Sequence, residues 1–276
     1  MNTKKNKEEV VNKVAIEIEA LLIRRIRKLE KEISSFLNIN PFLMSALRDI
    51  HELKNLDDLA NFLFISHMAS GHATSFGKTI DEKILPNVFG TIKLDSVQRR
   101  KRKMNSSAYN EIDHIVNPHS DTDWCLLSVK AGPWTIQDAS AHSLYSAFKQ
   151  IGDFNLYGKE IVVGVFYGNE SSLTNKYEIL RGINPRQQSQ FVVLDYVRVL
   201  AGKDFWSWLN GGEERTQEWV LEGTQVGSSK VLSSNEDVAK IVRNAPERLK
   251  YELQEKYDLD FDSEIDWLKI LFAINN

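Results

Sequence analysis

The stretch EIDHIVNPHSDTDWCLLSVK, residues 111–130, contains two short apolar runs that flank a polar turn. The turn, residues 117–123, is rich in Asn, Pro, Ser and Asp, which favour turns. The sequence therefore predicts two strands, residues 109–117 and 124–131, joined as a hairpin. An isolated hairpin is not stable in water, so the fold class depends on what the flanking sequence packs against it.

Strand alternation places Ser128 and Lys130 on one face of the second strand, and the hairpin brings Asp113 close to both. A carboxylate and an ammonium group at the ends of adjacent strands are compatible with a hydrolytic site. Asp113 would hold Mg²⁺ through oxygen ligands, and Lys130 would stabilise developing charge or orient an attacking water. The alternative is an Asp–Lys ion pair that serves structure only.

The sequence after the hairpin predicts an α/β fold. A helix follows Gly132-Pro133, and the run EIVVGVFYG is typical of a strand that is buried on both faces. We expect this helix at residues 135–151, strands at 160–168, 176–183 and 191–200, a Gly/Ser-rich and mobile segment at 224–237, and helices at 237–257 and 263–274.

The N-terminal part of the chain is predicted to be helical. Apolar residues recur at helical spacing over residues 5–37, and this stripe could pack on the core or form a dimer interface. Asn40 followed by Pro41 is a strong helix start. Further helices are expected at residues 41–53, 56–69 and 75–85, the last ended by Pro86.

Composition bounds the class of protein. The chain has 276 residues, 42% hydrophobic and 26% charged, with a net charge of −3, which is the balance of a globular protein. No apolar run reaches the roughly 20 residues of a membrane span, and the N-terminus has no signal-peptide h-region. The only cysteine, Cys125, excludes an intrachain disulfide framework. We therefore expect an intracellular, cytoplasmic protein.

The predicted order of elements, α-β-β-β-α-β, is that of the PD-(D/E)xK nuclease core. Beyond this order, long blocks of the chain resemble type II restriction endonucleases of that superfamily, in particular those that cut the interrupted palindrome purine-GGNCC-pyrimidine (RGGNCCY). The blocks are GHATSFGKTIDEKILPNVFGTIKLD (71–95), EIDHIV (111–116), LLSVKAGPWTIQ (126–137), IVVGVFYGN (161–169), LTNKYEILRGIN (173–184) and GKDFWSWLNGGEERTQEWVLEG (202–223).

The resemblance covers about residues 38–223 and implies a Mg²⁺-dependent, homodimeric, prokaryotic DNA endonuclease. It implies a PD-(D/E)xK core with a mixed central sheet flanked by helices, and products that carry 5′-phosphates. The domain division expected with it is a helical region at 1–70 for dimerisation or for embracing DNA, the endonuclease core at 71–223, and a C-terminal helical extension of the same domain at 224–276.

The resemblance also implies Asp113 and Lys130 as catalytic residues, with Ser128 in the position that usually holds an acid. Two departures stand out: Ile112 replaces the proline of the "PD" half, and Ser128 supplies no carboxylate. Another acid should then complete the metal ligands. Our preferred candidate is Glu82, and the alternatives are Glu111 and Asp138. The main-chain carbonyl of Val129 is a further possible metal ligand.

DNA contacts are predicted from local clusters of cations. The run at residues 99–103 has five successive basic residues, which is either solvated surface or a phosphate-contacting loop. A polar loop at residues 186–188 offers base contacts, although an ordinary surface loop is the simpler interpretation. A palindromic site requires two-fold protein symmetry, hence a homodimer. The predicted phosphate-contacting residues are Arg99, Arg100, Lys101, Arg102, Lys103, Lys78 and Arg181.

Two other functions are compatible with this sequence. One is a non-catalytic, sequence-specific DNA-binding protein on the same scaffold, in which Asp113 and Lys130 form a structural pair. The other is a repair-type or RNA-directed PD-(D/E)xK nuclease, which would select a nucleic-acid structure rather than a palindrome.

Overall fold

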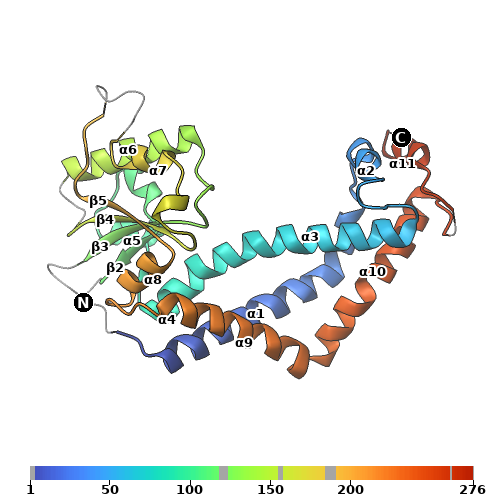
Figure 1. Ribbon diagram of the computed structural model, residues 1–276, viewed down its shortest axis with the longest axis horizontal. Coiled ribbons are helices and arrows are strands. Elements are labelled where there is room, and N and C mark those ends of the chain that lie inside the picture. The colour runs from blue at the N-terminus through green and yellow to red at the C-terminus, as the bar shows by residue number, and fades with distance from the viewer. Residues whose placement is uncertain (1–3, 118–123, 155–157, 184–190, 262, 276) are drawn as a thin grey trace. The chain divides into compact units, whose positions relative to one another are not determined.

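The computed structural model describes residues 4–117, 124–154, 158–183, 191–261 and 263–275 (Figure 1). The chain divides into two compact units: unit 1 is Met1–Glu17 with Gly77–Val226, and unit 2 is Ile18–Phe76 with Gly227–Asn276. The division differs from the expected one, because the C-terminal helices belong with the N-terminal helical region and not with the sheet. Three long helices contain the boundaries: α1 (Lys7–Glu32), α3 (Leu56–Thr79) and α9 (Thr216–Ser234).

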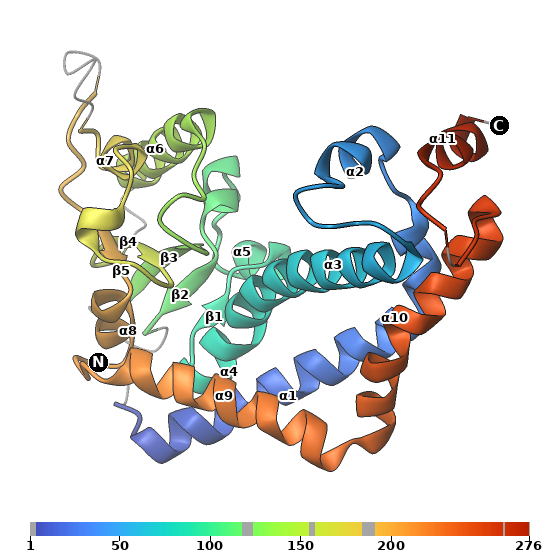
Figure 2. The ribbon, with the colours of Figure 1, turned by 45° about the vertical axis from the view of Figure 1, so that its right-hand side comes forward.

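Unit 1 contains a five-stranded mixed sheet with the strand order β1-β2-β3-β4-β5 (Figure 2). The first three strands form an antiparallel meander, and β4 and β5 continue parallel to β3. The predicted α/β class and the predicted hairpin are therefore confirmed. The strands are β1 (Ile92–Lys93), β2 (His114–Val116), β3 (Cys125–Lys130), β4 (Ile161–Val165) and β5 (Val197–Ala201).

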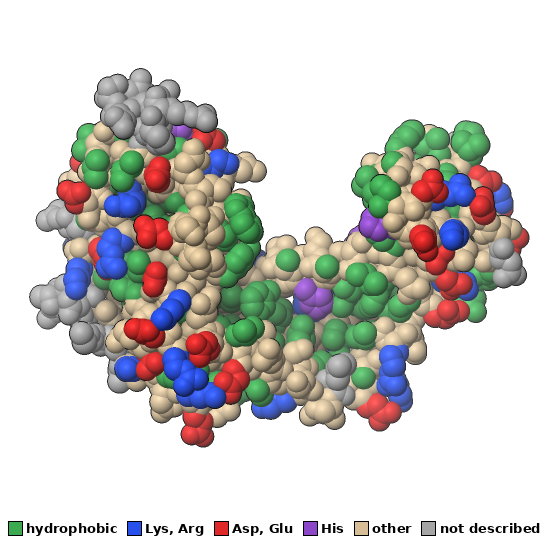
Figure 3. Space-filling model, viewed as in Figure 1, with side chains coloured by type: hydrophobic (Ala, Val, Ile, Leu, Met, Phe, Trp, Pro, Cys, Tyr) green, Lys and Arg blue, Asp and Glu red, His purple; other side chains and the backbone are tan. Residues whose placement is uncertain are grey.

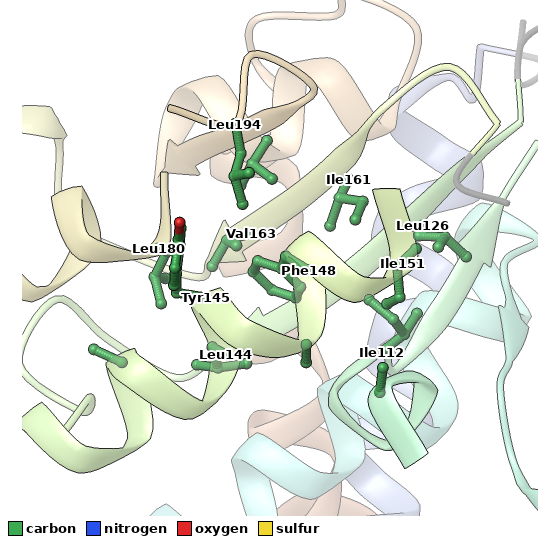
Figure 4. Packing of buried hydrophobic residues seen from close by; sticks show 14 of the residues in the cluster. Ile112, Leu126, Leu144, Tyr145, Phe148, Ile151, Ile161, Val163, Leu180 and Leu194 are labelled. Atoms are coloured by element: carbon green, nitrogen blue, oxygen red, sulfur yellow. The ribbon is translucent and has the colours of Figure 1, made fainter. Parts of the chain in front are cut away.

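One face of the sheet packs against α6 (Asp138–Asp153). Leu144, Phe148 and Ile151 of α6 are buried with the strand residues Leu126 and Val163 (Figure 4). This apolar stripe recurs at helical spacing, so burial of its face fixes the helix on the sheet. The turn η3 (Ser107–Glu111) and the helix α7 (Lys176–Leu180) complete the same cluster.

The helix α8 (Lys203–Leu209) packs against the other face of the sheet. A Cβ at Gly164 of β4 would lie 2.3 Å from Cε2 of Phe205. Glycine at this position therefore allows α8 to pack directly on the strand backbone.

Several predicted elements of unit 1 were wrong in type or extent. Residues 176–180 form the helix α7 and not a strand, because Tyr177, Ile179 and Leu180 bury one side of a helical turn. The strand expected from residue 191 begins only at Val197, and the one expected from residue 109 begins only at His114. The predicted turn at residues 118–123 lies outside the described residues. A short helical turn, η4 (Glu170–Ser172), follows β4.

The segment before the sheet is one continuous run of helix. A π-helical turn, η2 (Ile80–Ile84), connects α3 to α4 (Leu85–Phe89). Pro86 does not end the helix as expected, since α4 continues past it to Phe89. The C-cap is Gly90, which has φ of +72°. The helix α5 (Ser96–Lys101) lies between β1 and β2, where a basic loop was expected.

Unit 2 is helical and has its own apolar core. Leu29 and Ile33 from the N-terminal part pack with Leu59 of α3 and with Leu249 and Leu253 from the C-terminal part. Figures 1 and 2 trace its helices. They are the corresponding parts of α1, α3 and α9, together with η1 (Ile33–Leu37), α2 (Pro41–Leu47), α10 (Glu236–Tyr257) and α11 (Trp267–Asn275).

The predicted helix start at Asn40 is confirmed, because its side chain accepts a hydrogen bond from the Leu43 N–H. The helix is shorter than expected and ends at Leu47. The Gly/Ser-rich segment at residues 224–237 was expected to be mobile but is helical: α9 continues to Ser234 and α10 starts at Glu236. Glycine and serine weaken a helix without excluding it when apolar neighbours are buried.

Unit 2 leaves large apolar side chains exposed on α2 and α11, including Phe42, Leu268 and Phe272. Figure 3 shows hydrophobic side chains gathered over these two helices. Across the described parts of the chain, no helix combines the length and apolar character needed to cross a membrane.

Candidate functional site: an acidic pair beside the β2–β3 hairpin

The hairpin register fixes the position of Asp113. His114 pairs with Leu127 in the antiparallel ladder, so the residue before β2, Asp113, lies opposite Ser128. The Asp113 carboxylate is held by the main chain, since its Oδ2 accepts a hydrogen bond of 2.8 Å from the Val129 N–H. Its own N–H donates to the Leu127 carbonyl at 2.9 Å. Asp113 is therefore oriented by β3 itself.

A second carboxylate, Asp81, lies near Asp113 and comes from the π-helical turn η2. Lys93 at the end of β1 connects the two acids. Its Nζ donates to Asp81 Oδ1 at 2.7 Å and to Asp113 Oδ1 at 3.4 Å. All three side chains are partly exposed. The structure thus brings together two carboxylates from different elements, at the edge of the sheet where the hairpin begins.

The buried ring of His114 holds Asp81 from the other side. His114 Nε2 lies 2.7 Å from Asp81 Oδ1, and Nδ1 lies 3.0 Å from the Thr91 hydroxyl. A carboxylate accepts but does not donate, so we assign the Nε2 proton to the bond with Asp81. In the neutral ring, Nδ1 then accepts from Thr91. Each polar atom of this fully buried ring has a partner.

These contacts determine the charge of Asp81. Burial raises the pKa of its carboxyl group, but hydrogen bonds from His114 and Lys93 outweigh burial, and the resulting pKa lies below that of an ordinary aspartate. Asp81 is therefore ionised throughout the neutral pH range.

Lys130 ends β3, and within the described residues its ammonium group has no recorded hydrogen bond or ion pair. Ser128 is fully buried, and its Oγ has no hydrogen-bond partner among those residues. No recorded contact within the same residues joins Asp113 to Lys130 or to Ser128. The hairpin brings the three residues to adjacent strands, as expected, while the direct contact of Asp113 is with the Val129 main chain.

The acid expected to complete the site was Glu82, whereas the structure places the neighbouring Asp81 beside Asp113. Glu82 is exposed and makes none of the recorded contacts of this cluster among the described residues. Glu111 is half-buried at the end of η3. Asp138 is the exposed first residue of α6, 3.5 Å from His142 Nε2, and Gln137 rather than Asp138 is the N-cap. Val129 contacts Asp113 through its N–H, and the predicted role of its carbonyl stays a prediction.

Sequence reasoning missed Asp81, Lys93, His114 and Thr91. One signal for Asp81 was available: Ile80, Ile84 and Leu85 form the buried face of this helical segment, and Asp81 borders it whereas Glu82 does not. Lys93 and Thr91 come from a region in which no strand was located, so their pairing with the hairpin could not be deduced.

The basic run begins in α5 and continues past its end. Arg99 donates to the Leu94 carbonyl at 3.2 Å, and Lys103 has φ of +60°. Within the described residues, none of the five cations has a recorded acid partner, which leaves them available to an anion. Lys78 is exposed near the end of α3, and Arg181 is exposed at the end of α7. Residues 186–188, considered for base contacts, lie outside the described residues.

The donor set can be tested against Mg²⁺, the implied cofactor. Among the described residues, no cluster of three or more His, Cys, Asp or Glu side chains has metal-binding geometry. Mg²⁺ is commonly bound by one or two carboxylates, with waters and substrate phosphates completing its ligands. Asp81 and Asp113 fit that chemistry, and Lys93 is already a cation between them.

The sequence matches no known protein-family model, and no curated protein matches it significantly.

Proposed function

We propose that this protein is a type II restriction endonuclease of the PD-(D/E)xK kind, which hydrolyses both strands of DNA at a short, RGGNCCY-like palindrome. The observation that carries the proposal is the pair of carboxylates, Asp81 and Asp113, beside a hairpin whose second strand ends in Lys130. The order of elements supports it: helix, three antiparallel strands, crossover helix α6 and parallel strand β4.

In this proposal Asp81 and Asp113 hold the divalent cation, and Asp81 takes the role that was first expected of Glu82. When bound, Mg²⁺ polarises the phosphodiester and lowers the pKa of a bound water. Val129 orients Asp113 through its N–H, and His114 orients Asp81. Lys130 stabilises the charge that develops on the phosphate or orients the attacking water. Products carry 5′-phosphates and 3′-hydroxyls.

The proposed substrate also implies a partner and a place of action. A palindrome is matched by a two-fold symmetric protein, so we propose a homodimer that acts in a prokaryotic cytoplasm. The exposed apolar side chains on α2 and α11 supply a surface for the dimer contact. A monomer in light scattering at micromolar protein would contradict this part of the proposal.

One observation favours a second function. Lys93 already contacts both carboxylates, as a cation in a purely structural ion-pair cluster would. This alternative is a non-catalytic, sequence-specific DNA-binding protein, with the cations of residues 99–103 contacting phosphates.

The deciding experiment incubates the purified protein with a fully sequenced phage DNA, with Mg²⁺ or with EDTA, and sequences the fragment ends. We expect discrete, Mg²⁺-dependent fragments that share one palindrome. Asp113→Ala and Lys130→Ala should fold and bind DNA but lose cleavage. Intact DNA that shifts in a gel would favour the DNA-binding protein, and cleavage without a shared palindrome would favour a repair-type nuclease.

A further inference from the structure

Two exposed aromatic side chains lie just beyond the C-terminal ends of β3 and β4. Trp134 is 69% exposed and Tyr167 is 50% exposed. Trp134 follows Lys130 by four residues, and Tyr167 follows Val165, the residue that pairs with Lys130 in the parallel ladder. Both rings therefore lie on the short segments that leave the sheet beside Lys130.

The turn that carries Trp134 is tightly held. The Gly132 carbonyl accepts a hydrogen bond from the Tyr177 hydroxyl and another from Thr135 Oγ1, both of 2.8 Å. A Cβ on Gly132 would lie 2.3 Å from the Tyr167 hydroxyl oxygen, so Tyr167 packs directly on the glycine backbone. The segment that carries Tyr167 therefore packs against the turn that carries Trp134.

The exposure of the Trp134 indole to water does not stabilise the fold. Trp and Tyr lose little conformational entropy on binding and carry much of the binding energy at interfaces. Lys130, which has no recorded partner within the described residues, adds a positive charge on the adjoining strand.

We propose that Trp134 and Tyr167 form the apolar part of the DNA contact next to the cleaved phosphate. This inference rests on the proposed nuclease function. The rings pack against deoxyribose and base edges, while Lys130 faces the phosphate. Contacts of this kind position the duplex and carry little sequence information. Trp134 and Tyr167 are accordingly positioning residues.

The test is fluorescence anisotropy in EDTA, where no cleavage takes place, with a fluorescein-labelled duplex that carries RGGNCCY and with a scrambled duplex. Trp134→Ala and Tyr167→Ala should each weaken binding about tenfold or more. Both duplexes should be affected alike. Trp134→Phe and Tyr167→Phe keep a ring and should lose less than their alanine counterparts.

Phe154→Ala is the matched control. Phe154 is an exposed aromatic residue just after α6, at the end of that helix opposite to the turn, and its loss should leave binding within about twofold of the wild type. Thermal unfolding establishes that each variant is folded. If the wild type binds DNA and both alanine variants bind it equally well, this inference is overturned and the nuclease proposal stands. A wild-type protein that neither binds nor cuts duplex DNA would overturn both.

Discussion

The ammonium group of Lys93 lies between two carboxylates, 2.7 Å from Asp81 Oδ1 and 3.4 Å from Asp113 Oδ1. A divalent cation that binds the same oxygens has to compete with this fixed positive charge. If the proposed metal site is correct, Lys93 has two opposing effects: it stabilises the folded protein without metal, and it weakens metal binding.

Lys93→Met should bind Mg²⁺ about three- to tenfold more tightly than the wild type, because the competing charge is gone. Isothermal titration calorimetry measures the change directly. Lys83→Met is the control, since Lys83 is exposed on the same helical turn as Asp81 and makes no recorded ion pair among the described residues. Equal affinities in the wild type and Lys93→Met would show that Lys93 and the metal occupy different places.

Asp81→Asn should reduce DNA cleavage by about 100-fold or more, because an amide replaces a proposed metal-binding carboxylate of nearly the same shape. Glu82→Gln, one residue away on the exposed side, should leave cleavage within about twofold of the wild type. Single-turnover cleavage rates at saturating Mg²⁺ distinguish the two acids. The reverse result would restore Glu82 as the acid of the site.

Thr91→Val should lower the free energy of unfolding by about 1–2 kcal/mol, because it leaves a buried ring nitrogen of His114 without its partner. Thr174→Val is a matched control: the Thr174 hydroxyl is buried and has no hydrogen-bond partner among the described residues, so its removal should cost almost nothing. Urea unfolding curves give both values. Similar losses for the two variants would mean that the Thr91 hydrogen bond adds no stability.

Tyr177 makes stability sensitive to alkaline pH. Burial raises the pKa of its hydroxyl from the usual 10.0 to about 12, and the effect of burial exceeds that of a hydrogen bond to Thr135, which lowers the pKa. The stability contributed by the neutral Tyr177 hydroxyl is complete below about pH 10 and is lost as the pH rises towards 12. This is a change of about 3 kcal/mol in the free energy of unfolding. Tyr177→Phe should lack this component of the decline, measured as the free energy of unfolding against pH. Parallel curves for the two proteins would contradict the shifted pKa.

Gly164→Ala should destabilise the protein by about 1–3 kcal/mol, because the new methyl group collides with Phe205 of α8. Gly77→Ala should have the opposite effect, a gain of about 0.5–1 kcal/mol, since position 77 lies in α3 and a Cβ there meets nothing within 4 Å. Thermal unfolding of the two variants tests the packing of α8 on the sheet. A neutral Gly164→Ala would show that α8 moves away at little cost.

The β-branched run at residues 160–168 and the two runs around the turn were enough to predict β4 and the β2–β3 hairpin, because their burial pattern is continuous. The structure of short segments was harder to predict. Residues 176–180 have buried positions that fit either period over so few residues, and only packing against α6 makes them a helix.

The candidate site was likewise predicted only in part. Asp113 and Lys130 belong to the hairpin, so local pattern placed them on adjacent strands. The choice between Asp81 and Glu82 depends on the rotation of a helix that contains a π-helical turn, where one residue more than usual fits in the turn. The apolar positions Ile80, Ile84 and Leu85 indicate the buried side of this helix, but nothing in the local sequence reveals the π-helical turn. The partners Lys93 and Thr91 depend on β1, which has only two residues.

The strand β3 pairs antiparallel with β2 over residues 125–127 and parallel with β4 over residues 126–130. Inserting or deleting a single residue between Cys125 and Lys130 would turn every later side chain of the strand to the opposite face and direct Lys130 away from its present side. Among homologous proteins, length variation should therefore be absent within this strand.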